Sequence, residues 1–355
     1  MNLNNVTGHT AESISETFRL NFVRWNDSNE SWIGNIAYDI LRSASIAGSP
    51  AMPGFVEGET FHVHAEAFSY FDHSIVSGIQ DWYAQARAMA AHWSLQHGRT
   101  EPIELPGTWC FVAQPWSNVF WHWICEGLVK ISAFEAAGFT GGYIVPGGVG
   151  FVRRSLELLN IDPCRLHYCS VPYAHIEKLI VPHRFRAQID LRNHLDAVDW
   201  LRTHLVSGQS ADEPLKIYVA RRDNRSIVNE DDLLTLLTEH GFRHVSMENL
   251  DFADQIALVS RTGIFAGPHG SAFAHTMFMP RRSSIVEIFS PTYVNPCMLT
   301  TSMHLNQDYA MVVGYTDAAI GQPRDSPILA NIELVKLSLE RAEALAQYYK
   351  SRRVI

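Results

Sequence analysis

The sequence has few cysteines and no long basic or apolar run. Five cysteines occur among 355 residues, and no two of them form a Cys-x-x-Cys pair. This usage makes a disulfide framework or a structural zinc site unexpected and fits a reducing compartment. No apolar stretch reaches the roughly 18 residues that a membrane-spanning helix needs, and the polar start, MNLNNVTGHTAES, does not resemble a signal peptide. We therefore expect a cytoplasmic protein with at most peripheral contact at the inner membrane face.

The charge balance argues against nucleic-acid binding. The chain carries 28 Lys and Arg against 37 Asp and Glu, a formal net charge of -9. Binding to nucleic acid depends on neutralising phosphates, so an anionic small ligand would need a local cluster of cations instead. With 46% hydrophobic and 18% charged residues, a chain of this length can bury two cores.

The first hundred residues give only a weak pattern. Helices are expected over residues 32–47 and 80–96, and a strand is expected within 60–71. From Gly107 the alternation is clearer. It predicts strands at 109–113, 142–145 and 165–170, with helices at 119–137 and 149–159.

The strand–helix alternation restarts after a polar stretch at 207–213. It predicts strands at 216–220, 243–247, 264–266 and 283–289, with helices at 230–240, 252–260 and 271–279. This alternation is typical of α/β domains with a doubly wound parallel sheet. We expect an N-terminal domain over 1–175 and a C-terminal domain over 176–330. An amphipathic helix within 331–355 is expected to pack back across both domains.

Ligands of doubly wound folds bind where the parallel strands end. Arg221, Arg222 and Arg225 directly follow the strand predicted at 216–220, and Asn229 opens the next helix. Forked hydrogen bonds from guanidinium groups can hold a phosphate or diphosphate. A solvated basic turn is the alternative.

The second segment in such a position is the glycine-rich loop FAGPHGSAFAH at 265–275. A strand ends here and a helix begins at Ser271, so backbone N–H groups and the helix N-terminus can bind an anion. His269 and Gly270 lie in the loop, where the imidazole can donate to a phosphate oxygen. A tight turn with a packed histidine is the alternative.

Glu287 lies near the end of the apolar strand predicted at 283–289. A carboxylate in this position can bind a ribose diol, as acidic groups do in dinucleotide-binding folds. An internal salt bridge explains the same residue, and the sequence does not choose between the two.

His122 and Glu126 are four residues apart and share one face of the predicted helix. Either the imidazole or the carboxylate can take a proton from an attacking hydroxyl. Lys130 continues the same face, so a surface Glu126–Lys130 ion pair is the alternative.

In this order, these segments resemble glycosyltransferase family 61. The stretches IYVARRDNRSIVNE, GPHGSAFAH and IVEIF, with Gly241, Phe242 and Gln255, are similar to its C-terminal block. SNVFWHWICEGLVKI resembles its upstream histidine–acid helix. The family often has Asp followed by Leu-Pro-Arg where Glu126 stands. Its turn often reads HGA with a later Asn, where this chain has Ser271 and His275.

The resemblance implies a GT-B-like fold, with two Rossmann-like doubly wound domains facing a cleft. Domain 1–175 would then be the acceptor-side domain, and domain 176–330 would be the nucleotide-sugar-binding domain. It also implies inverting transfer of a sugar from a nucleotide sugar, with UDP-sugar as the leading candidate. The family includes eukaryotic O-linked N-acetylglucosamine transferases, plant xylan-type transferases and bacterial members that build capsular or lipopolysaccharide glycans. The acceptor is therefore expected to be a hydroxyl of a glycan or lipid-linked glycan. No nucleic-acid partner is expected, and a homodimer is left open.

Carried over by residue, the resemblance assigns Arg221 and Arg225 to the diphosphate. The turn His269–Gly270–Ser271 would cap that diphosphate, with Asn229 also at the donor site and Glu287 on the ribose. His122 and Glu126 would face the acceptor, with Glu126 as the expected base and His122 as its rival or orienting partner. No cofactor beyond the nucleotide sugar is expected, and metal independence is predicted because arginines can replace a divalent ion.

Other function classes stay open. A non-catalytic nucleotide- or sugar-binding module keeps the anion site and assigns His122 and Glu126 to packing. An oxidoreductase is disfavoured because no G-x-G-x-x-G motif follows a strand. A metal hydrolase is disfavoured because His62 and His64, the nearest histidine pair, have no matching carboxylate motif.

Overall fold

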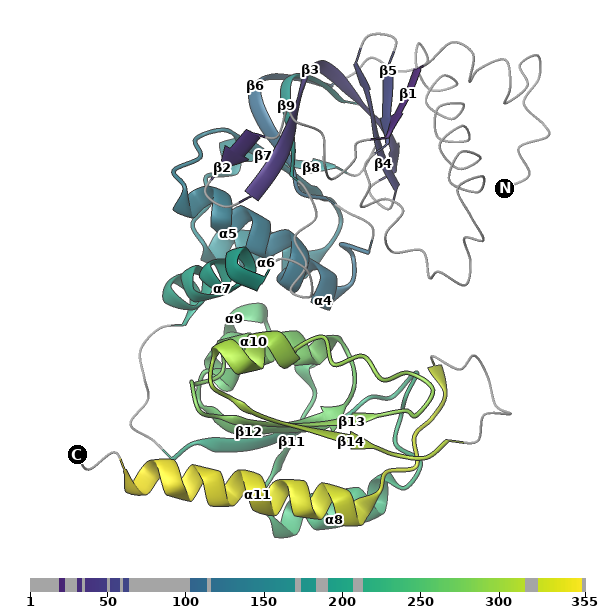
Figure 1. Ribbon diagram of the computed structural model, residues 1–355, viewed down its shortest axis with the longest axis vertical. Helices are drawn as coiled ribbons and strands as arrows, with labels where there is room; N and C mark the ends of the chain where they lie inside the picture. The colour runs from purple at the N-terminus through teal and green to yellow at the C-terminus, as the bar shows by residue number, and fades with distance from the viewer. Residues whose placement is uncertain are drawn as a thin grey trace, which may run out of the picture. The chain divides into compact units, whose positions relative to one another are not determined.

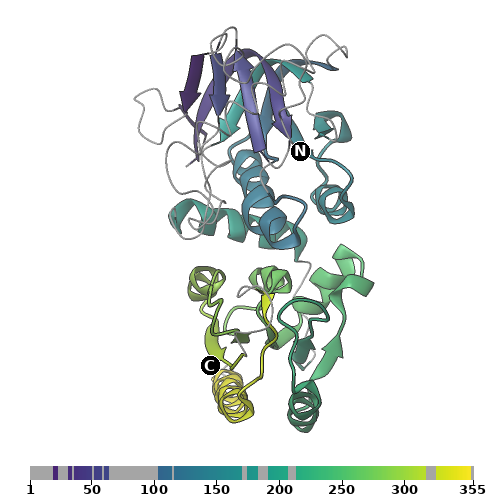
Figure 2. The same ribbon diagram turned by 90° about the vertical axis from the view of Figure 1, so that its right-hand side faces the viewer.

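The chain forms two compact units, Met1–Arg186 and Ala187–Ile355, and each is described by itself (Figures 1 and 2). The computed structural model describes residues 19–22, 31–33, 36–49, 52–57, 60–63, 103–113, 116–169, 174–182, 191–206, 213–316 and 325–352. Within those ranges, no helix has the length and apolar composition required to cross a membrane.

The first unit is built on a mixed sheet. Its described strands follow the order β1-β5-β4-β3-β9-β6-β7-β8, with β2 paired to β3. The pairs β9–β6, β6–β7 and β7–β8 are parallel, whereas β4 and β9 pair with β3 in antiparallel fashion. The bounds are β1 Arg19–Phe22, β2 Ser31–Ile33, β3 Ile36–Ser49, β4 Met52–Glu57, β5 Thr60–Val63, β6 Ile103–Phe111, β7 Gly142–Pro146, β8 Leu166–Cys169 and β9 Ala174–Pro182.

The helix predicted over 32–47 is wrong, because β2 and most of β3 occupy these residues. Apolar residues at 36, 37, 40, 41 and 44 have helical spacing, but pairing of β3 with strands on both sides overrides that local preference. The strand predicted within 60–71 is present as β5 over its first residues. The rest of that strand and the helix predicted at 80–96 lie outside the described residues.

Helical segments connect the parallel strands of the first unit. The predicted helix at 119–137 is present, but a π-helical stretch, η2 (Trp123–Leu128), separates α4 (Phe120–His122) from α5 (Val129–Ala136). The predicted helix at 149–159 is α6 (Gly150–Leu158), and a 3-10 turn, η3 (Pro163–Arg165), precedes β8. Strand β9 pairs with both β3 and β6. The two units therefore divide after Arg186, later than the 175/176 boundary expected from sequence.

The second unit contains a fully parallel five-stranded sheet with the order β11-β10-β12-β13-β14. Its bounds are β10 Leu215–Val219, β11 Arg243–Val245, β12 Thr262–Pro268, β13 Ser284–Phe289 and β14 Asp308–Val313. The alternation in the sequence predicted the first four of these strands and missed β14. The chain direction across the sheet reverses between β10 and β12, which makes this gap the topological switch point of a doubly wound fold. The unit is thus compatible with the predicted Rossmann-like half.

Helices cover both faces of this sheet. In Figure 1, α8 (Glu230–Glu239) and α11 (Ile332–Ser351) lie on one side, with α9 (Phe252–Val259) and α10 (Leu299–His304) on the other. The 3-10 helix η5 (Ser271–Phe278) packs against α9 and α10. The unpredicted helix α7 (Leu191–Leu205) joins the same unit, because its Arg202 donates to the Met279 carbonyl oxygen at 2.7 Å.

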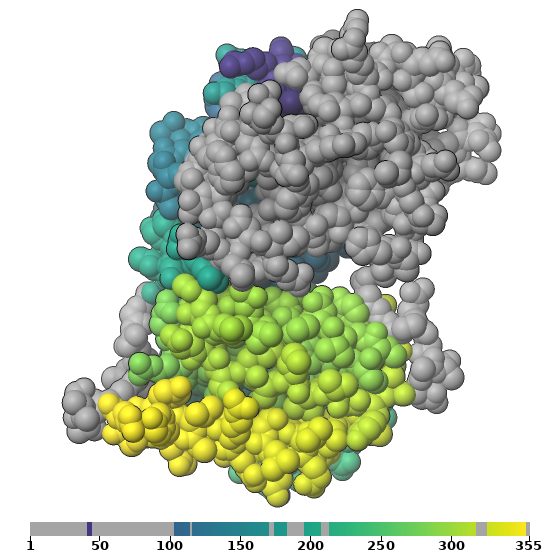
Figure 3. All heavy atoms as spheres, in the orientation of Figure 1, coloured from purple at the N-terminus to yellow at the C-terminus, as the bar shows by residue number. Residues whose placement is uncertain are grey.

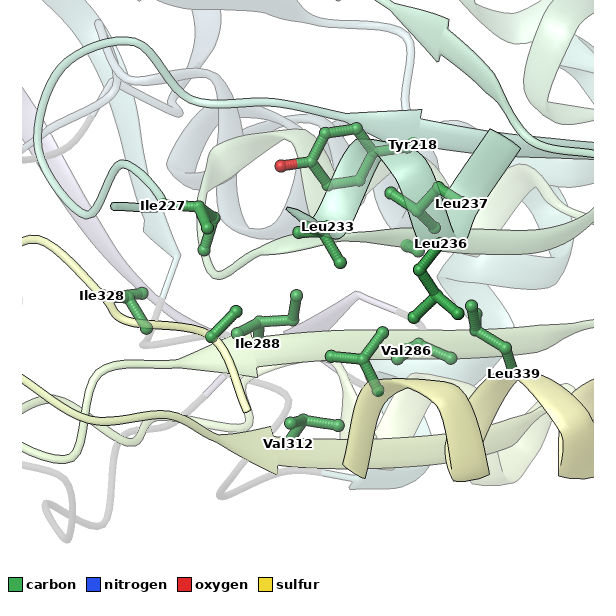
Figure 4. Packing of buried hydrophobic residues seen from close by; sticks show 13 residues of the cluster. Tyr218, Ile227, Leu233, Leu236, Leu237, Val286, Ile288, Val312, Ile328 and Leu339 are labelled. Atoms are coloured by element: carbon green, nitrogen blue, oxygen red, sulfur yellow. The ribbon is translucent and has the colours of Figure 1, made fainter. Parts of the chain in front are cut away.

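The core on the α8–α11 side joins strand and helix side chains into one cluster. Figure 4 shows Tyr218, Val286, Ile288 and Val312 of the sheet facing Leu233, Leu236 and Leu237 of α8 and Leu339 of α11. In α11 the predicted apolar stripe is buried at Val335, Leu339 and Ala342. The opposite side of the helix forms part of the surface in Figure 3. Its packing on the sheet of the second unit is shown by contacts with β12, β13 and β14, whereas packing across both domains stays a prediction.

The two faces of α11 provide a matched stability test. Leu339 is fully buried, while Leu337 is 59% exposed on the same helix. We expect Leu339→Ala to lower the free energy of unfolding by about 2–5 kcal/mol, because it leaves a cavity in the core. Leu337→Ala should change it by less than about 0.5 kcal/mol. Urea unfolding of both variants measures the difference, and equal losses would contradict this packing.

Candidate functional site

The switch point of the second sheet brings two of the predicted segments together. The arginine loop, residues 220–225, follows β10, and the histidine loop, His269 and Gly270, follows β12. A Cβ atom on Gly270 would lie 2.0 Å from Nη1 of Arg221. The glycine therefore lets the guanidinium of Arg221 lie directly against the histidine loop, which a side chain at this position would prevent.

The arginine loop is held in one conformation by local hydrogen bonds. Nε of Arg221 donates to the Asn224 carbonyl oxygen at 2.8 Å, and Asn224 donates to the Asp325 carboxylate at 3.0 Å. The backbone N–H of Arg225 donates to the Asp325 carbonyl oxygen at 3.2 Å. Arg225 has a φ of 60°, a left-handed conformation that is uncommon for residues other than glycine. A constrained conformation of this kind often marks a functional position.

The positive charge of this loop is partly desolvated. Burial lowers the pKa of Arg221, and the neighbouring charge of Arg225 lowers it further. Asp223 and Asp325 act in the opposite direction. Two guanidinium groups that repel each other at a strand end favour an anion between or beside them, because its charge relieves the repulsion.

An aromatic residue that the sequence analysis missed links the two loops. The guanidinium of Arg225 lies over the ring of Tyr293, 5.2 Å from its centroid. The Tyr293 ring in turn lies 5.5 Å from that of His269. Tyr293 follows β13, so loops after three neighbouring strands meet at this edge. Its position just beyond a predicted strand end was the available signal, but a single aromatic residue has no distinctive spacing.

Glu287 is completely buried, and its carboxylate has two partners within the second unit. Its Oε1 lies 2.5 Å from Nδ1 of His269, and its Oε2 accepts a hydrogen bond from the hydroxyl of Tyr309 on β14. This contact with His269 fits the internal pairing that the sequence left open, and the ribose contact stays a prediction. Both carboxylate oxygens are used within the protein, and Tyr309 was not predicted.

Two other predicted donor-site residues have clear structural surroundings. The Asn229 side chain donates to the Ala330 carbonyl oxygen at 3.1 Å and accepts from the Ala330 N–H at 2.8 Å. It joins the start of α8 to the segment before α11. Ser271 begins η5, which is a 3-10 helix rather than the expected α-helix. It remains next to Gly270 at the loop, where its partly exposed side chain can reach a ligand.

His275 is a packed histidine. Its Nδ1 lies 2.8 Å from the Ala272 carbonyl oxygen, and its Nε2 lies 2.9 Å from Oε1 of Gln255. Burial lowers the pKa of His275 to about 4, so the ring is neutral near pH 7. The Gln255 amide donates to the Met247 carbonyl oxygen at 2.8 Å. His275 and Gln255 therefore connect η5 to α9 and to the chain that precedes it.

The first unit holds the second predicted group, His122 and Glu126. Nδ1 of His122 lies 2.8 Å from Oε2 of Glu126. The side chain of His122 is 23% exposed and that of Glu126 only 2%. Glu126 lies in the π-helical stretch η2, and π-helical turns occur frequently at functional sites. The carboxylate can accept a hydrogen bond from Nδ1–H of His122, which would fix the orientation of the imidazole ring.

Glu126 and Lys130 are both buried, so the surface location considered for this pair from sequence is wrong. The neighbouring tryptophans differ in their surroundings. Trp123 is buried, and its indole N–H donates to the Ser155 hydroxyl at 2.9 Å. The Trp121 ring packs edge-on against His122 with centroids 5.0 Å apart. Trp123 is therefore a core residue, whereas Trp121 helps to orient the imidazole.

The described residues contain no group of three or more His, Cys, Asp or Glu side chains arranged to hold a metal ion. The arginine loop supplies the arginine side chains among the residues that the sequence analysis predicted to bind the donor. On these residues alone, the second unit can bind a phosphate-containing anion, and the first unit can accept a proton.

Two curated glycosyltransferases are similar to part of the chain. Protein O-linked-mannose beta-1,4-N-acetylglucosaminyltransferase 2 of Homo sapiens is 36% identical over 93 residues, which are 25% of this chain and 16% of that protein. The EGF domain-specific O-linked N-acetylglucosamine transferase of Drosophila melanogaster is 35% identical over 77 residues, which are 21% of this chain and 15% of that protein. The chain thus covers about a sixth of the length of these curated relatives.

The family model described as Glycosyltransferase 61 matches residues 120–286. This range contains the His122–Glu126 pair, the arginine loop and the histidine loop, and it ends one residue before Glu287. The matched range thus extends from α4 in the first unit into β13 in the second. Over this segment the chain is similar to the glycosyltransferase 61 family.

Proposed function

We propose that the protein is an inverting glycosyltransferase that transfers a sugar from a nucleotide sugar to a hydroxyl group of a glycan or lipid-linked glycan. The observation that carries the proposal is the meeting of the arginine and histidine loops at the switch point of a parallel sheet. A GT-B-like arrangement of two Rossmann-like units is part of the proposal. So are a cytoplasmic location and a role in polysaccharide biosynthesis.

The donor-side residues suit a diphosphate. The guanidiniums of Arg221 and Arg225 can form charge-assisted, forked hydrogen bonds with its oxygens, and loop N–H groups near Gly270 can add further donors. These groups are also suited to the departing nucleoside diphosphate, because its negative charge increases as the sugar leaves. UDP is the first nucleotide to test. The names of the relatives, which are N-acetylglucosaminyltransferases, favour N-acetylglucosamine as the first sugar.

For the acceptor side we propose His122 as the base, with Glu126 as its orienting partner. This order reverses the preference drawn from sequence, because the carboxylate is buried and the imidazole is the more exposed group. Nε2 of His122 takes the proton of the acceptor hydroxyl, whose oxygen forms a bond to the anomeric carbon. The bond from that carbon to the diphosphate oxygen breaks, and its electron pair leaves with the diphosphate.

The donor site is tested by Arg225→Ala, with Arg222→Ala as its control on an exposed neighbour. We expect Arg225→Ala to weaken binding of the cognate nucleotide sugar by about 10- to 100-fold, the effect of losing a charged hydrogen bond. Arg222→Ala should leave the Kd nearly unchanged. Thermal shifts with UDP-, GDP-, CMP-, dTDP- and ADP-sugars identify the donor, and calorimetry then gives the Kd values. An equal loss of affinity in both variants would mean that binding depends only on the total positive charge of the loop.

The base is tested by His122→Asn, with the exposed His204→Asn as its control. We expect the His122 substitution to lower kcat by about 10²- to 10⁴-fold, the usual contribution of a general base, while the donor Kd is retained. Glu126→Gln should also lower kcat, because the imidazolium loses its carboxylate partner. Radiolabelled sugar transfer measures kcat. Full transfer activity in His122→Asn would remove the proposed base, and donor binding without transfer to any acceptor would favour a non-catalytic binding module.

Metal independence is tested with a chelator. We expect EDTA to leave initial transfer rates within about twofold, because two arginines and the loop N–H groups neutralise the diphosphate. Manganese or magnesium should then add no comparable increase. A rate that disappears in EDTA and returns with manganese would contradict this part of the proposal and leave the donor site itself intact.

A further inference from the structure

The carboxylate of Glu287 lies in the middle of the second sheet, on a strand with neighbours on both sides. It is completely buried, so it requires hydrogen bonds or positive charge to offset its lost hydration. The Tyr309 hydroxyl donates to one oxygen, and Nδ1 of His269 lies 2.5 Å from the other. Burial and the nearby Glu287 raise the pKa of Tyr309, so its hydroxyl remains a hydrogen-bond donor.

The ring of His269 is held from several directions. Its backbone N–H donates to the Ile288 carbonyl oxygen at 2.8 Å. The imidazole stacks on the Phe289 ring, with centroids 5.0 Å apart, and meets Tyr293 at 5.5 Å. Its side chain is only 7% exposed. Within the part of the chain that the structure describes, no hydrogen bond to its Nε2 is recorded. The ring therefore has one fixed nitrogen and one that remains for a ligand.

We propose that Tyr309 and Glu287 are positioning residues that hold His269 with Nδ1 protonated and Nε2 directed to an oxygen of the donor diphosphate. This inference rests on the proposed function. The Glu287 carboxylate also balances the charge of a doubly protonated imidazole, so that Nε2–H can donate to the diphosphate. No proton has to be transferred for this role. Tyr309 acts entirely through Glu287 and does not touch the ligand.

The same sheet offers a matched comparison. The Tyr218 hydroxyl donates to a carboxylate oxygen of Glu230 at 2.9 Å, on the α8–α11 side of the sheet. Tyr218 is also buried, but no histidine hydrogen bond to Glu230 is recorded among the described residues. Loss of either tyrosine hydroxyl removes a hydrogen bond of the same kind. Only loss of the Tyr309 hydroxyl should therefore change how the His269 ring is held.

The experiment compares Tyr309→Phe, Glu287→Gln and Tyr218→Phe in the full chain. We expect Tyr309→Phe to weaken UDP binding by about 10-fold, equivalent to one lost hydrogen bond, and Glu287→Gln by at least as much. Tyr218→Phe should keep the wild-type Kd. Calorimetry with UDP measures these values, and thermal unfolding shows whether the two Tyr→Phe variants lose similar stability.

Proton NMR of the histidine rings provides a second readout that needs no ligand. In the wild-type protein, the Nδ1–H of His269 should give a low-field signal, because it lies in a short bond to a carboxylate. Tyr309→Phe should shift this signal and Glu287→Gln should abolish it, while Tyr218→Phe leaves it in place. A purely structural role for Tyr309 would change thermal stability without changing either the signal or UDP affinity.

The outcomes separate this inference from the proposed function. Wild-type UDP affinity and an unchanged His269 signal in Tyr309→Phe would overturn the positioning role, while Arg225→Ala still tests the donor site. Failure of the wild-type protein to bind any nucleotide sugar would overturn the proposed function. The NMR signal would then still decide whether Tyr309 and Glu287 hold the ring. If Glu287→Gln does not fold, Tyr309→Phe alone decides.

Discussion

The order of the parallel strands in the second unit is the constraint on which the donor-side residues depend. Because β10 and β12 are neighbours in space but not successive in sequence, the loops that follow them face each other at one edge. Because Gly270 has no side chain, Arg221 can lie directly against the histidine loop. Tyr293, in the loop after β13, lies close to both Arg225 and His269. No single loop supplies the whole arrangement. The sheet order combines a basic turn, a glycine turn and an aromatic residue into one group.

The sequence predicted the second unit better than the first for a physical reason. Strands β10, β12 and β13 are short and largely buried, and helices follow β10 and β11, so the hydrophobic period changes clearly along the chain. β14 was missed because it follows only the short helix α10 and not a long periodic one. In the first unit, β3 has apolar residues at helical spacing. Its strand conformation comes from pairing with the next strand, β4, and with β9, which is distant in sequence, and local periodicity does not reveal this pairing.

In the candidate site, too, the sequence predicted positions along the chain better than contacts between distant residues. Arg221, Arg225 and His269 were found because each follows a predicted strand, and the structure keeps them at that edge. Glu287 was assigned to ribose from its position near a strand end. That position does not show that the carboxylate is enclosed by His269 and Tyr309. The roles of His122 and Glu126 could not be separated from sequence, because both lie on one helix face and only the folded structure shows which is exposed.

The two histidine–carboxylate pairs show how one local arrangement can support two kinds of chemistry. In each, a buried carboxylate lies within hydrogen-bond distance of Nδ1 of a less buried imidazole. Their surroundings differ. His269 stacks on Phe289 and meets the tilted ring of Tyr293, which lies under Arg225, and this setting favours holding an anion. His122 is more exposed and lies beside Trp121 on a helix, which favours exchange of a proton with a hydroxyl. The carboxylate fixes the orientation of the ring in both cases, and the neighbouring charges and exposure determine what Nε2 can do.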